Sequence, residues 1–333
     1  MRREVTYGCL GSLHDGSPEL SLAFPGGAAT LERMKTSLDH LPEGKQRELA
    51  LVVRILFEEF EAVTARATQR WKKSGRILKV VLYGSYARGD WVDDPVGGYR
   101  SDYDILVVVS DDRLTDVVDF WAVADDRLLR ETSISQSLSA PVNFIVHSHS
   151  DVNGQLDRGR PFFVDIVEHG VALYEAKGFP FSTPRKLPEA QARAEAEHYF
   201  NEWFPSAERR FDLARTAAGK GYWKEAAFDL HQTAERLYHC VLLVLTLYSP
   251  KSHKLNFLRS QAEQIAPALI EAWPREGKFE RRGFELLRQA YVNARYSPHY
   301  KISEREVTWL TERVTTLQKL VERVCQERLR DVG

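Results

Sequence analysis

The sequence predicts an α+β protein in which a mixed sheet with helices is followed by an all-helical bundle. Short β-branched apolar runs occur in the first half of the chain, at 77–83, 103–109 and 142–146. A stretch with three prolines and a glycine, 177–188, then interrupts the pattern. Each later segment repeats its apolar residues at helical spacing, so two separate folding units are expected.

Composition and charge exclude several classes of protein. With 333 residues, 43% hydrophobic and 28% charged, the chain resembles neither collagen-like nor disordered sequences and is long enough for two or three domains. The net charge of -1 gives no general attraction to nucleic acid or to an anionic membrane. Contact with either would therefore require a local patch.

The cysteines and the N-terminal segment favour a cytoplasmic protein. Cys9, Cys240 and Cys325 are odd in number and lack metal-ligand spacing, so neither a disulfide framework nor a zinc site is expected. No apolar run has the length of a signal-peptide core or a membrane span. Residues 1–33 are rich in Gly, Ser and Pro and are expected to form a poorly ordered extension, with Met34 as an alternative start.

The first unit, residues 34–176, is expected to begin with an amphipathic helix over about 42–70. Val52, Leu56, Phe60 and Val63 recur there at helical spacing and should cover a sheet. The runs ending at 83 and 109 have the apolar, β-branched composition of internal strands. The remaining elements are a third strand at 142–146 and helices at about 112–131 and 162–168.

The second unit, residues 189–333, follows the linker 177–188 and is expected to be a helical bundle. Ser303 and Glu306 form a capping box ahead of the clearest apolar seam in the chain. Helices are predicted at 189–217, 222–248, 255–264, 278–295 and 304–328.

The strongest candidate site lies between the first two strands. Gly84-Ser85 directly follows one strand, and Asp102 and Asp104 stand at the start of the next. Residues two apart on a strand share a face, so both carboxylates can hold one or two magnesium ions. Gly84 permits close approach of the β- and γ-phosphates, and Ser85 adds a hydroxyl and an amide donor. This combination indicates phosphoryl or nucleotidyl transfer.

Gly84-Ser85, a spacer and Asp102-x-Asp104 together resemble the minimal nucleotidyltransferases of the DNA polymerase β-like superfamily, from about Lys35 to Glu175. The resemblance implies that Gly84 and Ser85 hold a nucleoside triphosphate. It also implies that Asp102 and Asp104 ligate Mg²⁺ or Mn²⁺. Nucleoside monophosphate would then pass to an acceptor, with loss of pyrophosphate.

Two features depart from that family's pattern. The 16 residues between Ser85 and Asp102 form a longer spacer than is usual in the minimal group. The third carboxylate expected on the later strand is replaced by Asn143, and an amide is not a general base. Either Asp90 or Asp94 takes the place of this third carboxylate, or catalytic turnover is weak or absent.

Arg88, His147 and His149 are three further candidate residues near this site. Arg88 either touches the phosphates or is a solvated arginine. His147 and His149 are two apart and can in principle share a metal, but no third ligand is suitably spaced. The favoured interpretation is that both histidines lie in a loop.

The second unit carries its own cluster, Arg295-Tyr296-Ser297-Pro298-His299-Tyr300. A histidine can move the proton of a ribose 2′-hydroxyl while an arginine stabilises charge on phosphorus, so the cluster suits RNA cleavage or nucleotide binding. Pro298 predicts that His299 leaves the helix that carries Arg295.

From about Glu189 to Arg328 the chain resembles the HEPN domains, which are found beside minimal nucleotidyltransferases. In HEPN ribonucleases the arginine and the histidine lie further apart than the three intervening residues found here, which weakens a ribonuclease assignment. The resemblance implies that Tyr296 and Tyr300 are candidate adenylylation acceptors, and that a homo-oligomer forms through this domain.

The favoured interpretation is a Mg²⁺-dependent nucleotidyltransferase fused to a HEPN domain. It would pass AMP from ATP to a protein, an RNA or its own bundle, in a toxin-antitoxin-like or defence role without membrane partners. Three alternatives remain open: a non-catalytic nucleotide sensor, a ribonuclease acting through Arg295 and His299, and an antibiotic nucleotidyltransferase.

Overall fold

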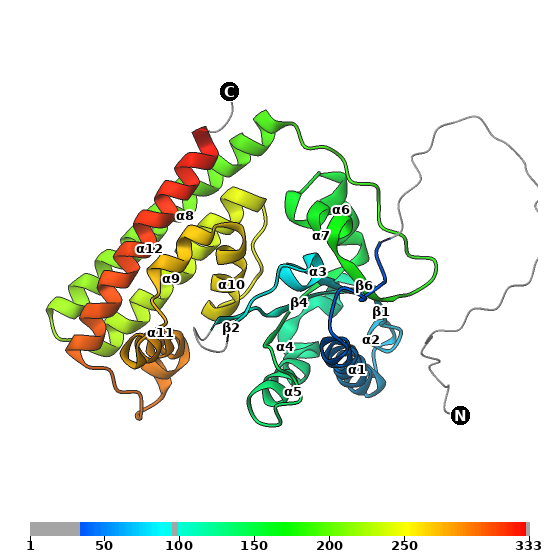
Figure 1. Ribbon diagram of the computed structural model, residues 1–333, viewed down its shortest axis with the longest axis horizontal. Helices are drawn as coiled ribbons and strands as arrows, with labels where there is room; N and C mark the ends of the chain where they lie inside the picture. Colours follow the sequence, from blue (N-terminus) through cyan, green and yellow to red (C-terminus); the bar gives the residue numbers. More distant parts are fainter. Residues whose placement is uncertain (1–33, 95–98, 331–333) are drawn as a thin grey trace, which may run out of the picture. The chain divides into compact units, whose positions relative to one another are not determined.

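The computed structural model describes residues 34–94 and 99–330, so the predicted extension 1–33 lies outside the described residues. The first half contains a four-stranded sheet with helices on both faces (Figure 1). In chain order its elements are α1 (Glu43–Ala65), α2 (Arg70–Lys73), β1 (Ile77–Tyr83), α3 (Ser85–Arg88), β2 (Asp93–Asp94), β3 (Tyr99–Arg100), β4 (Tyr103–Val109), the 3₁₀ helix η1 (Asp112–Thr115), α4 (Val117–Phe120), α5 (Ala122–Ser133), β5 (Val142–Ser148), α6 (His149–Asp157), α7 (Pro161–His169) and β6 (Val171–Glu175).

The sheet has the order β5-β4-β1-β6 and is mixed, as predicted. Strand β1 is antiparallel to β4 and β6, whereas β4 and β5 are parallel. Val80 and Leu82 of β1 pack with α1 and α5, while the intervening Val81 packs with α6 and α7. Burial of both faces explains why β1 and β4 are continuous apolar runs rather than alternating ones.

Several elements differ from the predictions. The first helix ends at Ala65 rather than near 70. The helix predicted over 112–131 is divided into η1, α4 and α5, because the Asp116 side chain accepts from the Asp119 N–H and caps a new helix. Strand β6 and helix α6 were not predicted. The two histidines do not lie in a loop: His147 belongs to β5 and His149 begins α6.

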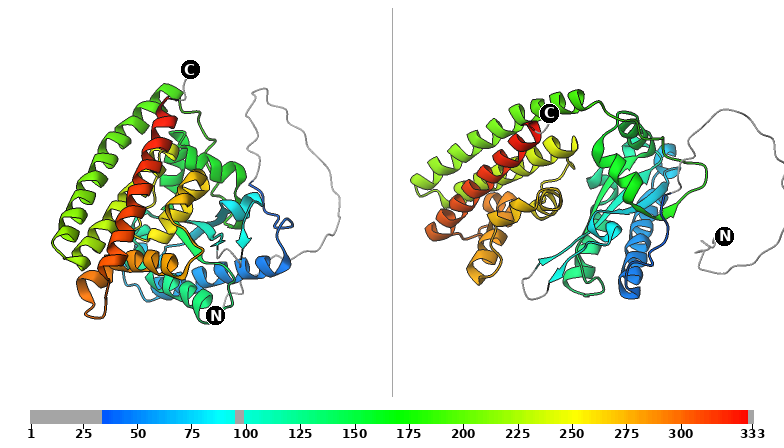
Figure 2. Two further views of the ribbon diagram at one scale, coloured as in Figure 1. Left: turned by 60° about the vertical axis from the view of Figure 1, so that its left-hand side comes forward. Right: turned by 45° about the horizontal axis from the view of Figure 1, so that its top comes forward.

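The second half is all-helical, as predicted, and its five α-helices agree with the predicted bounds within two or three residues (Figure 2). The central helix, α9, contacts every other α-helix of the bundle. The elements are α8 (Glu189–Gly219), α9 (Trp223–Thr246), α10 (Leu255–Ile265), the 3₁₀ helix η2 (Pro267–Ala272), α11 (Lys278–Tyr296) and α12 (Glu304–Arg330).

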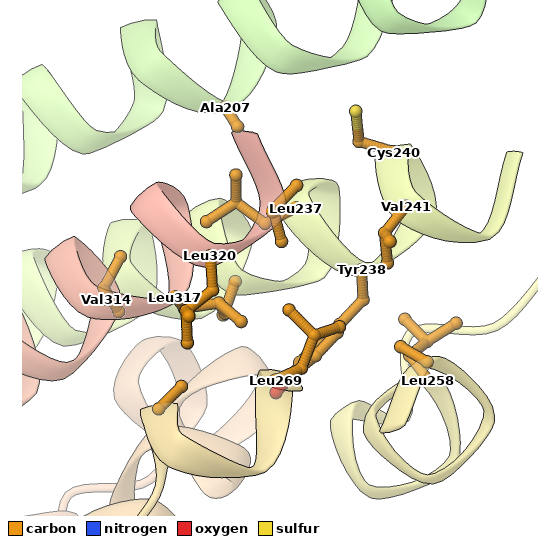
Figure 3. Packing of buried hydrophobic residues seen from close by; sticks show 14 of the residues in the cluster. Ala207, Leu237, Tyr238, Cys240, Val241, Leu258, Leu269, Val314, Leu317 and Leu320 are labelled. Carbon is orange, nitrogen blue, oxygen red and sulfur yellow. The ribbon is translucent and has the colours of Figure 1, made fainter. Parts of the chain in front are cut away.

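Leucine, valine and alanine side chains from all these helices form one buried cluster (Figure 3). Within it, the Trp273 indole N–H donates to the Tyr238 hydroxyl at 2.8 Å, joining the segment after η2 to α9. The predicted capping box is confirmed: the Ser303 N–H donates to Glu306 at 2.8 Å, and the Glu306 N–H donates to the Ser303 hydroxyl at 3.3 Å. Among the described residues, no helix combines the length and apolarity needed to cross a membrane.

Aromatic contacts join the sheet region to the bundle. The ring of Tyr248, which follows α9, stacks on Phe162 of α7 with centroids 4.3 Å apart. Its hydroxyl lies 2.8 Å from Nε2 of His147 on β5. Phe257 of α10 belongs to the buried cluster that covers the α6–α7 face of the sheet. Helix α10 is thereby held against the start of β4, where the candidate site lies.

The segment 177–188 contains neither helix nor strand, yet part of it packs on α6. The Ser182 N–H donates to Oδ1 of Asn153 at 2.8 Å, and the Arg185 N–H donates to the carbonyl of Leu156 at 3.0 Å. Phe181 is buried in the same cluster as α6 and α7. The chain is therefore fixed to the sheet region until shortly before α8 begins.

Candidate active site

The Gly84-Ser85 turn joins β1 to α3 and faces the start of β4. Gly84 has φ of +73°, a conformation that side chains other than glycine rarely adopt. A Cβ at this position would lie 2.7 Å from Oδ2 of Asp104. The Ser85 hydroxyl is buried and has no hydrogen-bond partner among the described residues. A buried, unpartnered hydroxyl beside a glycine turn suits a ligand with hydrogen-bonding oxygens.

The two predicted metal-ligating carboxylates are both buried and lie close together. Asp104 is in β4 with 0% exposure, and Asp102, which directly precedes β4, is 9% exposed. Burial raises the pKa of Asp102 to about 6. Burial, followed by the charge of Asp102, raises the pKa of Asp104 well above its usual range. Both shifts reflect negative charge held away from water.

The hydrogen-bond partners that the described residues give these carboxylates are neutral. Asn143 Nδ2 donates to Oδ2 of Asp102 at 2.8 Å. The side chains of Gln261 and Gln264 donate to Oδ1 and Oδ2 of Asp104 at 2.8 and 2.9 Å. A divalent cation would supply the positive charge that these amides lack, so the donor set fits magnesium.

This metal site would be incomplete without substrate. Among the described residues, no group of three or more histidines, cysteines or carboxylates is placed to hold a metal ion. Magnesium commonly binds one or two carboxylates and completes its octahedron with water and phosphate oxygens. Asp102 and Asp104 together with a triphosphate meet that requirement.

Asn143 occupies the position of the expected third carboxylate. It pairs with Asp104 across the parallel β4–β5 ladder. Its amide donates to Asp102 and so orients that carboxylate. An amide cannot act as a general base toward an acceptor hydroxyl. Of the two substitute acids, Asp90 is exposed and paired with Arg88, and the side chain of Asp94 lies outside the described residues.

Arg88 ends helix α3 and lies near the site without bonding to it. Its guanidinium pairs with Asp90 at 3.4 Å and with Asp165 at 3.9 Å. Its positive charge nonetheless lowers the pKa of Asp104, against the stronger effect of burial. Arg88 is therefore close enough to influence a bound anion.

His147 and His149 do not converge on a shared ligand. His147 lies between Asp151, 2.6 Å from its Nδ1, and Tyr248. His149 Nε2 instead donates to the carbonyl of Pro180 at 2.9 Å. Each ring serves a structural contact.

The predicted cluster in the bundle is spread over two environments. Arg295, in the last turn of α11, lies over the rings of Tyr291 and Tyr296 at 4.8 and 4.9 Å. His299 lies beyond the end of α11, as Pro298 predicted. Among the described residues, no hydrogen bond or ring contact joins Arg295 to His299.

The two candidate acceptor tyrosines differ sharply in exposure. Tyr296 is 73% exposed. Tyr300 is buried, and its hydroxyl donates to the carbonyl of Leu286 at 2.9 Å. Of the two hydroxyls, only that of Tyr296 is open to solvent.

The bundle also contains a histidine and carboxylate pair, His253 and Glu235. His253 is exposed, and its Nδ1 donates to Glu235 at 2.9 Å. Glu235 is itself buried on α9. The rings of His253 and Tyr291 stack with centroids 4.9 Å apart, which brings His253 to the same aromatic ring as Arg295.

Gln261 and Gln264 are the site residues that sequence reasoning missed. Their spacing places both on one face of α10, but no local pattern links that face to an aspartate 157 residues earlier. Only the tertiary contact between α10 and β4 reveals them.

A cavity of about 1470 Å³ adjoins the site between β5 and the segment after α9. Asn143, His147 and Ser148 line one side, and Tyr248 and Lys251 line the other. Asn143 also bonds to Asp102, so its amide lies between the cavity and this buried carboxylate, which does not itself line the cavity.

The sheet topology, the glycine turn and the paired carboxylates define a nucleotidyltransferase-like unit joined to a helical bundle. Residues 200–324 match the family described as "HEPN domain". A protein of Methanocaldococcus jannaschii named "Putative protein adenylyltransferase" is 34% identical over 103 residues, which are 31% of this chain and 84% of that protein. The chain therefore belongs to the fused nucleotidyltransferase and HEPN proteins.

Proposed function

We propose that the protein transfers AMP from ATP to a hydroxyl group of a protein acceptor, with Mg²⁺ held by Asp102 and Asp104. The observation that carries the proposal is the convergence of the Gly84-Ser85 turn on two buried carboxylates whose hydrogen-bond partners are neutral. The printed name of the archaeal relative supports adenylyl transfer to protein.

In this reaction the acceptor oxygen forms a bond to the α-phosphorus, and the bond from that phosphorus to pyrophosphate breaks. Gly84 and the Ser85 hydroxyl would hold the phosphates, and the bound magnesium would neutralise their charge. Asn143 cannot accept a proton, so the proton of the acceptor hydroxyl would pass to solvent water as the bond to phosphorus forms.

The acceptor would approach through the cavity beside β5, because this cavity meets the site at Asn143. Its volume accommodates a side chain with several neighbouring residues. Tyr296 is a further acceptor candidate because its hydroxyl is exposed, which would require transfer between two copies of the chain or a rearrangement within one.

The proposal is tested by incubating the purified protein with Mg²⁺ and labelled ATP, with and without cell extract. Wild type is expected to label itself or a partner protein, and intact mass should show the addition of AMP. Asp102→Ala/Asp104→Ala should abolish labelling. The proposal would be rejected if no transfer from any of the four common nucleoside triphosphates occurred in wild type or in Gln261→Ala/Gln264→Ala, which lacks the two amide donors to Asp104.

A further inference from the structure

We propose that helix α10 of the bundle is a gate over the nucleotide site, with Gln261 and Gln264 standing where the metal ion and the phosphates must bind. This inference rests on the proposed function, because it takes Asp104 as a metal ligand. In the closed arrangement seen here, the bundle would inhibit the nucleotidyltransferase unit of its own chain.

Both oxygens of Asp104 accept hydrogen bonds from α10. Gln261 donates to Oδ1 at 2.8 Å, and Gln264 donates to Oδ2 at 2.9 Å. An amide hydrogen that points at a carboxylate oxygen excludes a cation from the same lone pair. Asp104 is fully buried, so water does not compete for these bonds. The two glutamines therefore compete with a metal ion for both oxygens of Asp104.

Helix α10 also obstructs the Gly84-Ser85 phosphate turn sterically. Oε1 of Gln264 lies 3.1 Å from the position that a Cβ on Gly84 would have. The space beside Gly84, where a phosphate would approach, is thus occupied by Gln264 together with Asp104, whose Oδ2 lies 2.7 Å from the same position. Gln264 blocks the turn and the carboxylate at once.

The gate is held in place by contacts outside the site. Phe257, earlier on α10, is buried in the cluster that covers the α6–α7 face of the sheet. Lys254, which precedes α10, pairs with Asp125 of α5. Tyr248 stacks on Phe162. Opening would thus move the N-terminal end of α10 and the segment before it, rather than the glutamine side chains alone.

Removal of the two glutamines has opposite effects on nucleotide affinity depending on whether they bind the nucleotide or compete with it. If the glutamines bound the nucleotide, removing them would weaken binding. If they compete with it, removing them strengthens binding, because the free energy of two hydrogen bonds to a charged group no longer opposes the metal and the phosphates.

The test compares four proteins: wild type, Gln261→Ala/Gln264→Ala, Asp102→Asn/Asp104→Asn, and a matched control, Gln289→Ala/Gln318→Ala. The control glutamines lie on α11 and α12 and bond only within the bundle. Mn²⁺ binding is followed by electron paramagnetic resonance, and Mg²⁺–ATP binding by calorimetry. We expect the gate variant to bind both roughly tenfold or more tightly than wild type and the control. The aspartate variant should bind neither.

Hydrogen exchange of wild type supplies a second measurement that does not depend on a variant folding. Saturating Mg²⁺–ATP should accelerate amide exchange across residues 255–265 as α10 leaves the site. Unchanged or slower exchange there, with ATP bound, would overturn the gate.

Transfer of labelled AMP separates this inference from the proposed function. Tighter Mn²⁺ and ATP binding by the gate variant without any transfer would support the gate and reject the enzymatic proposal. Transfer by wild type, together with equal or weaker binding by the gate variant, would support the enzyme and reject the gate. If the gate variant does not bind more tightly and no AMP is transferred, both the gate and the enzymatic proposal are rejected.

Discussion

At the scale of single residues, Asp102 and Asp104 are two buried carboxyl groups, and the charges of Arg275 and Arg88 offset only part of the effect of their burial. Their amide partners satisfy hydrogen bonds but carry no charge. Burial of two carboxyl groups lowers the stability of the folded protein but provides a binding site for a cation. Active sites commonly show this trade-off between stability and function.

The raised pKa of Asp102 leads to a prediction about stability. Its pKa rises from 3.8 unfolded to about 6 folded, so the folded chain keeps a proton that the unfolded chain releases between about pH 4 and pH 6. Folding stability therefore falls as pH rises through that window, by about 3 kcal/mol in total. Asp102→Asn should raise the metal-free unfolding midpoint at pH 7, with a smaller gain at pH 4, while abolishing transfer. A variant that is destabilised equally at both pH values would contradict this expectation.

Gly84 gives a second prediction at this scale. Gly84→Ala would place a Cβ 2.7 Å from Asp104 at φ of +73°, so it should cost about 1–3 kcal/mol of unfolding free energy and impair ATP binding. Gly44→Ala is the control, because no atom lies within 4 Å of its Cβ and α1 accepts alanine there. The control should gain about 0.5–1 kcal/mol. Denaturant unfolding compares the two, and equal effects would show that the turn is not constrained.

At the scale of elements, hydrogen bonds inside the bundle fix the position of η2 and the chain that follows it. Tyr238→Phe removes the acceptor of the Trp273 N–H, and Trp273 is 1% exposed. The unpaired donor should cost about 1–3 kcal/mol. Tyr222→Phe, at an exposed position, should change stability by less than about 0.5 kcal/mol. Chemical denaturation of both variants is the measurement, and a neutral Tyr238→Phe would imply that water reaches the indole.

The sequence was most informative where an element is decided by its own residues. The runs ending at Tyr83 and Val109 are buried on both faces, so their apolar residues marked the strands without ambiguity. Strand β6 (Val171–Glu175) was missed because it is short and turns partly exposed toward its end. Helix α6 was missed because Gly154 and several polar residues interrupt its apolar periodicity.

The residues of the candidate site also fall into those that local sequence pattern predicts and those that it does not. Gly84, Ser85, Asp102 and Asp104 lie at adjoining strand ends, so local pattern was enough to bring them together. Gln261 and Gln264 act through packing between remote segments, which a single sequence does not encode in any short motif. The spatial relation between Arg295 and His299 likewise depended on how α11 ends.

At the scale of the whole molecule, aromatic packing couples the bundle to the sheet region. Tyr248 contacts Phe162, Phe163 and His147. Tyr248→Ala should destabilise the protein by about 1–3 kcal/mol and resolve its calorimetric unfolding into two transitions, because the halves lose their shared core. Tyr222→Ala, an exposed tyrosine on the same bundle, should leave one transition. A single transition in Tyr248→Ala would show that other contacts suffice.

The segment 177–188 between the two halves determines how strongly the α10 glutamines compete with metal and nucleotide for the site. Its contacts with α6 extend to Arg185, so only three residues, 186–188, separate the last anchor from the start of α8. A tether this short keeps α10 near the phosphate turn at an effective concentration in the millimolar range. Dilution of the protein would not weaken that competition, because α10 and the nucleotide site belong to the same chain. Nucleotide concentration, or a partner that captures the bundle, would set the fraction of molecules able to react.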